Sequence, residues 1–121
     1  MNTLFDRRKT NRIKLSKIEN FFRQCDIYVS SEKGDIDITI LDISPVGMRI
    51  SINGSEDQSK ISPQDKLFIR GCIFNDNIGF LSSQNVVAVW KENNICGFKF
   101  TPPLDLDELT IRSMIKHNQL Q

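Results

Sequence analysis

The sequence predicts an all-β domain, either an antiparallel sandwich or a small closed barrel, followed by a C-terminal helix. Short segments of alternating apolar and polar residues follow one another, separated by turn signals about every eight to twelve residues. No connection between them has the pattern of a crossover helix, so a parallel α/β sheet is not expected. The chain of 121 residues fits one domain with one core.

The clearest strand is 35–43, where isoleucines at every second position alternate with polar side chains. Residues 46–52 repeat this pattern. The polar stretch 53–65, which contains an Asn-Gly turn signal, predicts a loop. The full set of predicted strands is 24–30, 35–43, 46–52, 66–74, 78–83, 85–90 and 96–100.

The C-terminal part changes from strand to helix pattern. Asp105 and Glu108 have the spacing of a capping box, which predicts a helix over about 105–117. Cations near its end suit the helix dipole, and its apolar residues can share one face. Those apolar residues are Leu104, Ile111, Met114 and Ile115, and the C-terminal cations are Arg112, Lys116 and His117.

The cysteines and the single histidine offer little for catalysis or metal binding. Cys25, Cys72 and Cys96 are far apart, so neither a disulfide framework nor a metal pair is expected, and each should be a small buried residue in a reducing compartment. We therefore expect no metal, no cofactor and no enzymatic activity. No apolar run reaches the roughly 20 residues of a membrane span, and the N-terminus lacks a signal-peptide pattern, so a cytoplasmic location without membrane insertion is expected.

Positive charge is concentrated at the N-terminus although the formal net charge is only +1. The stretch "DRRKTNR" holds Arg7, Arg8, Lys9 and Arg12 with almost no apolar residue. By itself such a stretch is typical of a solvated tail. On a near-neutral domain it also indicates a local anion site rather than a surface coated for nucleic acid.

The segment "LDISPVGMRI" provides chemistry that arginines lack. Asp42 and Ser44 are two apart and should project from one face of a strand. Gly47 permits a positive φ and the close approach of another group to the backbone. A carboxylate accepts from the N1–H and N2–H₂ groups of guanine, whereas arginine pairs with phosphate and with guanine O6 and N7. Together they complement a guanine nucleotide that carries phosphate.

Three motifs, in this order, resemble the PilZ family over nearly the whole chain. They are R-x-x-x-R at 8–12, D-x-S-x-x-G at 42–47, and the late stretch "VVAVWKENNICGFKF". The resemblance implies a six-stranded antiparallel β-barrel of the split-barrel type with a C-terminal helix, acting as a bacterial receptor for the second messenger cyclic di-GMP. The implied organisation is a single domain over 1–121, with a mobile basic arm at 1–14, the barrel at 22–100 and the helix at 105–117.

The resemblance also implies a role for each motif residue. Arg8 and Arg12 would clamp the phosphates and bases, and Arg7 would influence whether one ligand or a stacked pair is bound. Asp42 would accept from the guanine edge. The remaining motif residues are Ser44, implied as a polar contact, and Gly47, implied in the tight turn.

Trp90 has two possible roles. By simple alternation it faces the opposite side of its strand from Val87 and Val89. It could stack on a guanine, or it could pack as an aromatic of the barrel or against the helix, which is the favoured interpretation.

Two other classes of protein are also compatible with this sequence. The chain could be a ligand-independent PilZ-like adaptor, or a small barrel that binds single-stranded nucleic acid, although such barrels usually show several exposed aromatics. The receptor interpretation predicts an effector protein in trans, no nucleic acid, and a monomer or weak dimer. Motility, biofilm (exopolysaccharide), pilus and virulence systems are all possible destinations of the signal.

Overall fold

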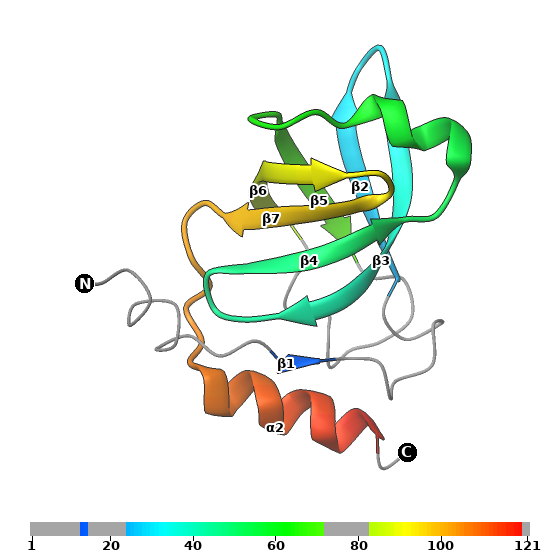
Figure 1. Cartoon of the computed structure of the whole chain (residues 1–121). Helices are drawn as coiled ribbons and strands as arrows, with labels where there is room; N and C mark the ends of the chain where they lie inside the picture. The colour runs from blue at the N-terminus through cyan, green and yellow to red at the C-terminus, as the bar shows by residue number, and fades with distance from the viewer. Residues whose placement is uncertain (1–12, 15–23, 72–82, 120–121) are drawn as a thin grey trace, which may run out of the picture.

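Six strands form a closed antiparallel barrel (Figure 1). The computed structural model describes residues 13–14, 24–71 and 83–119. The strands follow one another around the ring in the order β3-β2-β5-β6-β7-β4, and pairing of β4 with β3 closes it. This confirms the predicted six-stranded barrel. The strands are β2 (Gln24–Ser30), β3 (Gly34–Ile43), β4 (Gly47–Ile52), β5 (Lys66–Gly71), β6 (Gln84–Glu92) and β7 (Ile95–Phe100).

The barrel interior is filled by the apolar members of the alternating patterns. Each of the six strands contributes side chains that are at most 3% exposed, and they form a single cluster. Alternation therefore predicted the inward faces of β3 and β4 correctly, because every second side chain of a strand points to the same side. The largest fully buried side chains are Phe100, Ile27, Ile38, Ile40, Ile43, Met48, Ile50, Ile61 and Ile69.

A two-residue strand, β1 (Ile13–Lys14), extends the sheet beside the end of β3. It pairs antiparallel with β3, Ile13 opposite Ile43 and Lys14 opposite Asp42. The sequence did not predict this strand, which falls inside the expected arm 1–14. The arm's last two residues are thus paired in the sheet, while its other residues lie outside the described part of the chain.

Two other segments differ from the expectations. The predicted loop 53–65 contains a 3-10 helix, η2 (Ser55–Lys60), which is held to β6 by a hydrogen bond from Lys91 Nζ to the carbonyl oxygen of Gln58. Of the predicted strand 78–83, only Ser83 is described, and it lies in a turn with φ of 62°.

The cysteines depart from the expectation of three isolated buried thiols. Cys96 is free and buried, as expected. Cys25 is also buried but is disulfide-bonded, so the expectation of no disulfide was wrong for this residue. Cys72 lies outside the described residues. Spacing along the sequence failed to predict this bond because disulfide formation depends on the distance between two cysteines in the folded chain.

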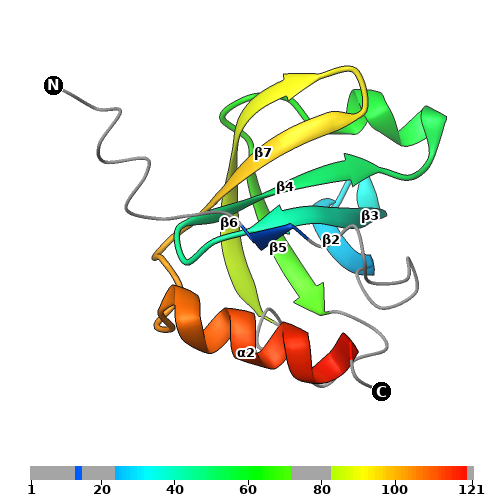
Figure 2. The ribbon, with the colours of Figure 1, turned by 60° about the horizontal axis from the view of Figure 1, so that its bottom comes forward.

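Helix α2 (Glu108–Gln119) lies across one end of the barrel, opposite the end that carries η2 (Figure 2). It begins three residues later than predicted, because Asp107 rather than Asp105 caps it: the backbone N–H of Thr110 donates to Asp107 Oδ1 at 2.7 Å. Ile111 is fully buried and joins α2 to the core, whereas Leu104 packs against the core ahead of the helix. No helix in the described ranges combines the length and apolar character needed to span a membrane.

Candidate functional site

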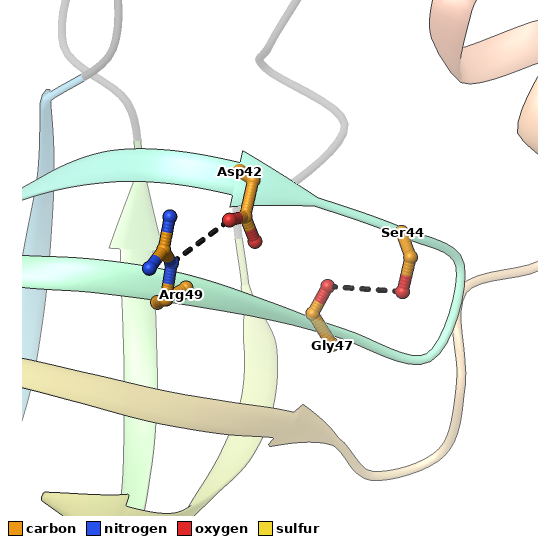
Figure 3. Close-up of polar contacts among 4 residues, drawn as sticks. All are labelled: Asp42, Ser44, Gly47 and Arg49. Carbon is orange, nitrogen blue, oxygen red and sulfur yellow. Dashed lines mark hydrogen bonds and ion pairs between the residues drawn. The ribbon is translucent and has the colours of Figure 1, made fainter. Parts of the chain in front are cut away.

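The hairpin between β3 and β4 is closed by Ser44 and Gly47 (Figure 3). The backbone N–H of Ser44 donates to the Gly47 carbonyl at 2.8 Å, and Ser44 Oγ donates to the same oxygen at 3.4 Å. Ser44 Oγ also accepts from the backbone N–H of Val46 at 3.3 Å. Ser44 is therefore a structural residue of this turn.

A β-bulge sets the direction of Asp42. Ile40 pairs with Ile50 and Asp42 pairs with Arg49, so Leu41 is the extra residue on β3. By its position in the sequence, Asp42 would continue the series of inward-facing isoleucines. The bulge instead turns Asp42 to the outer face of the barrel, the face on which Arg49 lies. Ser44 follows β3 in the turn, so strand alternation does not fix the direction of its side chain.

Asp42 forms an ion pair with Arg49, which the sequence did not single out. Arg49 Nε donates to Asp42 Oδ2 at 2.9 Å (Figure 3). The Asp42 side chain is 4% exposed and that of Arg49 is 42% exposed. A nearly buried carboxylate is thus linked to a half-exposed guanidinium on the neighbouring strand, and this is the kind of charge-assisted contact that orients both groups.

Gly47 is required by close packing rather than by backbone dihedral freedom. A Cβ atom on Gly47 would overlap the backbone carbonyl oxygen of Phe98 on β7. Its φ is not positive; among the described glycines only Gly34 has a positive φ. The expectation of close approach is confirmed, and the expectation that Gly47 uses a positive φ was wrong.

A second bulge brings Trp90 to the outer face of β6. Ala88 pairs with Phe98 and Trp90 pairs with Gly97, so Val89 is the extra residue. The indole of Trp90 lies over Gly97, where a Cβ atom would overlap its ring nitrogen. Trp90 is 38% exposed, so it is not a core aromatic of the barrel. The simple alternation that placed it opposite Val87 failed because of the bulge.

The two bulges align outward-facing residues into rows across four strands. In the first row Asp42 is opposite Arg49, Arg49 opposite Gly97, and Gly97 opposite Trp90. In the adjacent row Gly47 is opposite Lys99. A groove of about 300 Å³ lies along these rows. Its described lining residues are Ser44, Val46, Gly47, Val89, Trp90, Gly97, Phe98 and Lys99.

Four of the predicted site residues lie at or beside the groove, and three lie outside the described residues. Ser44, Gly47 and Trp90 line the groove, and Asp42 lies beside it without lining it. The predicted arginines Arg7, Arg8 and Arg12 lie outside the described residues. However, β1 begins directly after Arg12, and its residue Lys14 is opposite Asp42 on β3. The residue that follows Arg12 therefore lies close to the Asp42 end of the first row.

Three residues at or beside the groove were not predicted from the sequence: Arg49, Gly97 and Lys99. Arg49 and Lys99 each occupy a polar position between buried neighbours, so alternation could have placed them on the outer face. Nothing in the sequence showed that they share that face with Asp42 and Trp90, since this depends on the two bulges. Within the described residues, no group of three or more His, Cys, Asp or Glu side chains could hold a metal ion.

Comparison with known proteins gives one clear result. No protein-family model matches the chain, and no curated protein matches it. Its structure is similar to that of the "PilZ domain with c-di-GMP of YcgR from Escherichia coli", with a TM-score of 0.56 and 10% sequence identity. The similarity covers 94% of this chain and 88% of that chain. The chain therefore has a PilZ-like fold.

Proposed function

We propose that this chain is a receptor for cyclic di-GMP, bound in the groove beside the β3–β4 hairpin. One observation carries the proposal: the D-x-S-x-x-G segment and the exposed Trp90 meet at one groove on a PilZ-like barrel. Ser44 and Gly47 line that groove, and Asp42 lies in the row that ends at Trp90.

The groove offers the groups that a guanine needs. The indole of Trp90 lies over the β7 backbone and is 38% exposed, so it provides a flat surface for base stacking. The Asp42 carboxylate can accept from the guanine N1–H and N2–H₂ groups. Since Asp42 is almost fully buried, ligand binding would exchange its present contacts for contacts with the base.

The phosphates of the ligand would be bound by cations at the groove. Lys99 is the charged residue among its described lining residues. In our proposal Arg8 and Arg12 add guanidinium groups as the part of the N-terminal arm that precedes β1 closes over the ligand against Asp42 and Ser44, and Arg7 determines whether one or two ligands bind. Ordering a basic segment costs conformational entropy, which charge-assisted hydrogen bonds to phosphate offset.

The hairpin contacts also suggest how binding could change a partner surface. The backbone N–H groups of Phe100 and Leu104 donate to the carbonyls of Val46 and Pro45, both at 2.9 Å. These bonds connect the hairpin loop to the segment that leads into α2. In the first turn of α2, Leu109 is 75% exposed and offers an apolar contact. We infer that a bacterial effector protein reads this surface in trans, and that the chain itself is not an enzyme.

Isothermal titration calorimetry with cyclic di-GMP tests the proposal. We expect wild-type binding at low salt, and a loss of about tenfold or more in affinity for Arg8→Ala and for Asp42→Ala, because each removes a charge-assisted contact. Trp90 is the only tryptophan, so its fluorescence should change on titration. If the wild type does not bind, the receptor proposal is wrong, and a ligand-independent adaptor becomes the better interpretation.

A further inference from the structure

We propose that Arg49 determines the base specificity of this site: together, Asp42 and Arg49 form a reader of the guanine Watson–Crick edge. This inference rests on the proposed function, because it assigns a role within the same nucleotide site. The pair presents one donor, an N–H group of Arg49, followed by two acceptors, the carboxylate oxygens of Asp42. Cytosine presents that same sequence of groups to guanine in a base pair.

The contact between the two side chains leaves Arg49 free to make further hydrogen bonds. Arg49 donates to Asp42 through Nε, at 2.9 Å from Oδ2. A guanidinium has five N–H donors in a fixed planar arrangement, so Nη donors remain beside the carboxylate. The Arg49 side chain is 42% exposed, whereas that of Asp42 is 4% exposed. Arg49 is thus the accessible member of the pair.

The position of Arg49 in the row supports this role. It stands on β4 between Asp42 on β3 and Gly97 on β7, and Gly97 lines the groove beneath the Trp90 indole. Directly opposed residues of neighbouring strands have Cβ atoms about 5 Å apart. A nucleotide that enters from the groove would therefore meet Arg49 on its way to Asp42.

The chemistry of the pair distinguishes guanine from adenine. The edge of guanine presents O6, N1–H and N2–H₂ in order. When the two carboxylate oxygens accept from N1–H and N2–H₂, O6 lies beside one of them, where a donor of Arg49 can reach it. Adenine presents an amino donor and then the N1 acceptor, so the donor would face Arg49 and the N1 lone pair would face Asp42. Both contacts are repulsive, and repulsion of this kind is an effective source of specificity.

A second ion pair in the barrel provides a matched control. Arg70 Nε donates to Asp35 Oδ2 at 2.9 Å, and the side chain of Arg70 is 49% exposed. Its guanidinium lies over the Tyr28 ring, 4.7 Å from the ring centroid. Arg70 is on β5 and pairs with a β3 carboxylate as Arg49 does, but it lies outside the row of Asp42, Arg49, Gly97 and Trp90; neither arginine is among the groove's lining residues. Removing it deletes an ion pair with the same Nε contact, to a carboxylate that is 37% rather than 4% exposed, without touching the proposed site.

The test measures the affinities for cyclic di-GMP and cyclic di-AMP by calorimetry for the wild type and for Arg49→Ala, Arg49→Lys and Arg70→Ala. For Arg49→Ala we expect cyclic di-GMP affinity to fall about tenfold or more while cyclic di-AMP affinity does not fall, so that discrimination decreases. Arg49→Lys keeps the charge but loses the planar donors, so it should keep more affinity and still discriminate less than the wild type. Arg70→Ala should remain within about twofold of the wild type for both ligands.

The possible outcomes separate this inference from the proposed function. If the wild type binds and Arg49→Ala behaves as Arg70→Ala does, the role of Arg49 is wrong and the receptor proposal stands. If Arg49→Ala weakens both ligands equally, Arg49 supports the fold or contacts phosphate, and the specificity role is likewise wrong. If the wild type binds neither ligand, both proposals fail. Should Arg49→Ala not fold, as judged by circular dichroism, the discrimination ratio of Arg49→Lys decides the question.

Discussion

At the scale of single residues, Gly97 controls the position of Trp90. The indole lies in the space that a side chain at residue 97 would occupy. Any larger residue must therefore push the ring away from the β7 backbone. Because Trp90 is one wall of the groove, this glycine shapes the groove without offering a functional group of its own.

We expect Gly97→Ala to displace the Trp90 indole, which should shift the emission of the only tryptophan to longer wavelength. The overlap should also lower the free energy of unfolding by about 1–3 kcal/mol, as overpacking generally does. Fluorescence and urea denaturation measure the two effects. Gly54→Ala is the control, because its Cβ would meet only the side chains of Asp57 and Glu56, at 3.2 and 3.4 Å. An unchanged emission spectrum for Gly97→Ala would contradict the proposed packing.

At the scale of single elements, alternation predicted the strands well and failed at the bulges. The inward faces of β3 and β4 could be predicted directly, because a buried apolar face constrains every second residue. Leu41 and Val89, the extra residues of the two bulges, are ordinary apolar residues without Gly or Pro to mark them. The motif therefore identified Asp42, but the pairing of Asp42 with Arg49 and the exposure of Trp90 could not be predicted.

The start of α2 depends on the same kind of local detail. Asp105 and Asp107 both precede Glu108, and the capping-box spacing favoured Asp105. In the structure Asp107 accepts from the backbone N–H of Thr110, and this bond lowers the pKa of its carboxyl group below the ordinary 3.8. Spacing alone could not distinguish the two carboxylates, because capping depends on the backbone conformation of the residue itself.

Asp107→Ala should therefore reduce the melting temperature and the helix content of α2, while Asp107→Ser, which can also cap, should retain most of both. The folded-state pKa is lowered, so the stabilisation is present above the ordinary pKa and is lost as pH falls through the lowered value. The difference from the wild type should thus be largest near neutral pH and disappear in acid. Circular dichroism melts across this range measure it. An equal loss in Asp105→Ala, an exposed carboxylate outside the helix, would contradict the assignment.

At the scale of the whole molecule, the ring order separates two charged surfaces. β2 and β7 lie on opposite sides of the ring β3-β2-β5-β6-β7-β4. The outer face near β2 carries Asp26 opposite Asp37, and partial burial, together with repulsion from Asp35 and Asp37, raises the pKa of Asp26. Arg49 and Lys99 lie on β4 and β7. These two cations near the groove are thus separated from the Asp26–Asp37 pair, while Arg70 on β5 is next to that pair and bonds Asp35.

Because the ring of strands is closed, the core is a single unit. Ionisation of the buried Cys96 thiol can therefore be used to follow unfolding of the barrel. Its side chain is fully buried on β7, in the cluster to which all six barrel strands contribute. Burial raises the pKa of the Cys96 thiol from 9.0 to about 11. Since no strand of the barrel is an edge that can open alone, the thiolate forms readily only when the barrel unfolds.

This coupling predicts a loss of stability at alkaline pH. Above pH 9 the unfolded thiol releases its proton, whereas the folded thiol holds its proton up to about pH 11, so the free energy of unfolding falls between these values. The full share of Cys96 should be about 3 kcal/mol, because the pKa differs by about two units and each unit corresponds to about 1.4 kcal/mol. Roughly 2 kcal/mol of this should be lost by pH 10.5, which is still below the folded-state pKa. Urea denaturation at pH 8 and pH 10.5 should show a larger loss for the wild type than for Cys96→Val, which keeps the apolar packing. All other ionisable groups are the same in the two proteins, so their contributions cancel in the comparison. Equal losses in the two proteins would mean that Cys96 ionises without unfolding of the barrel.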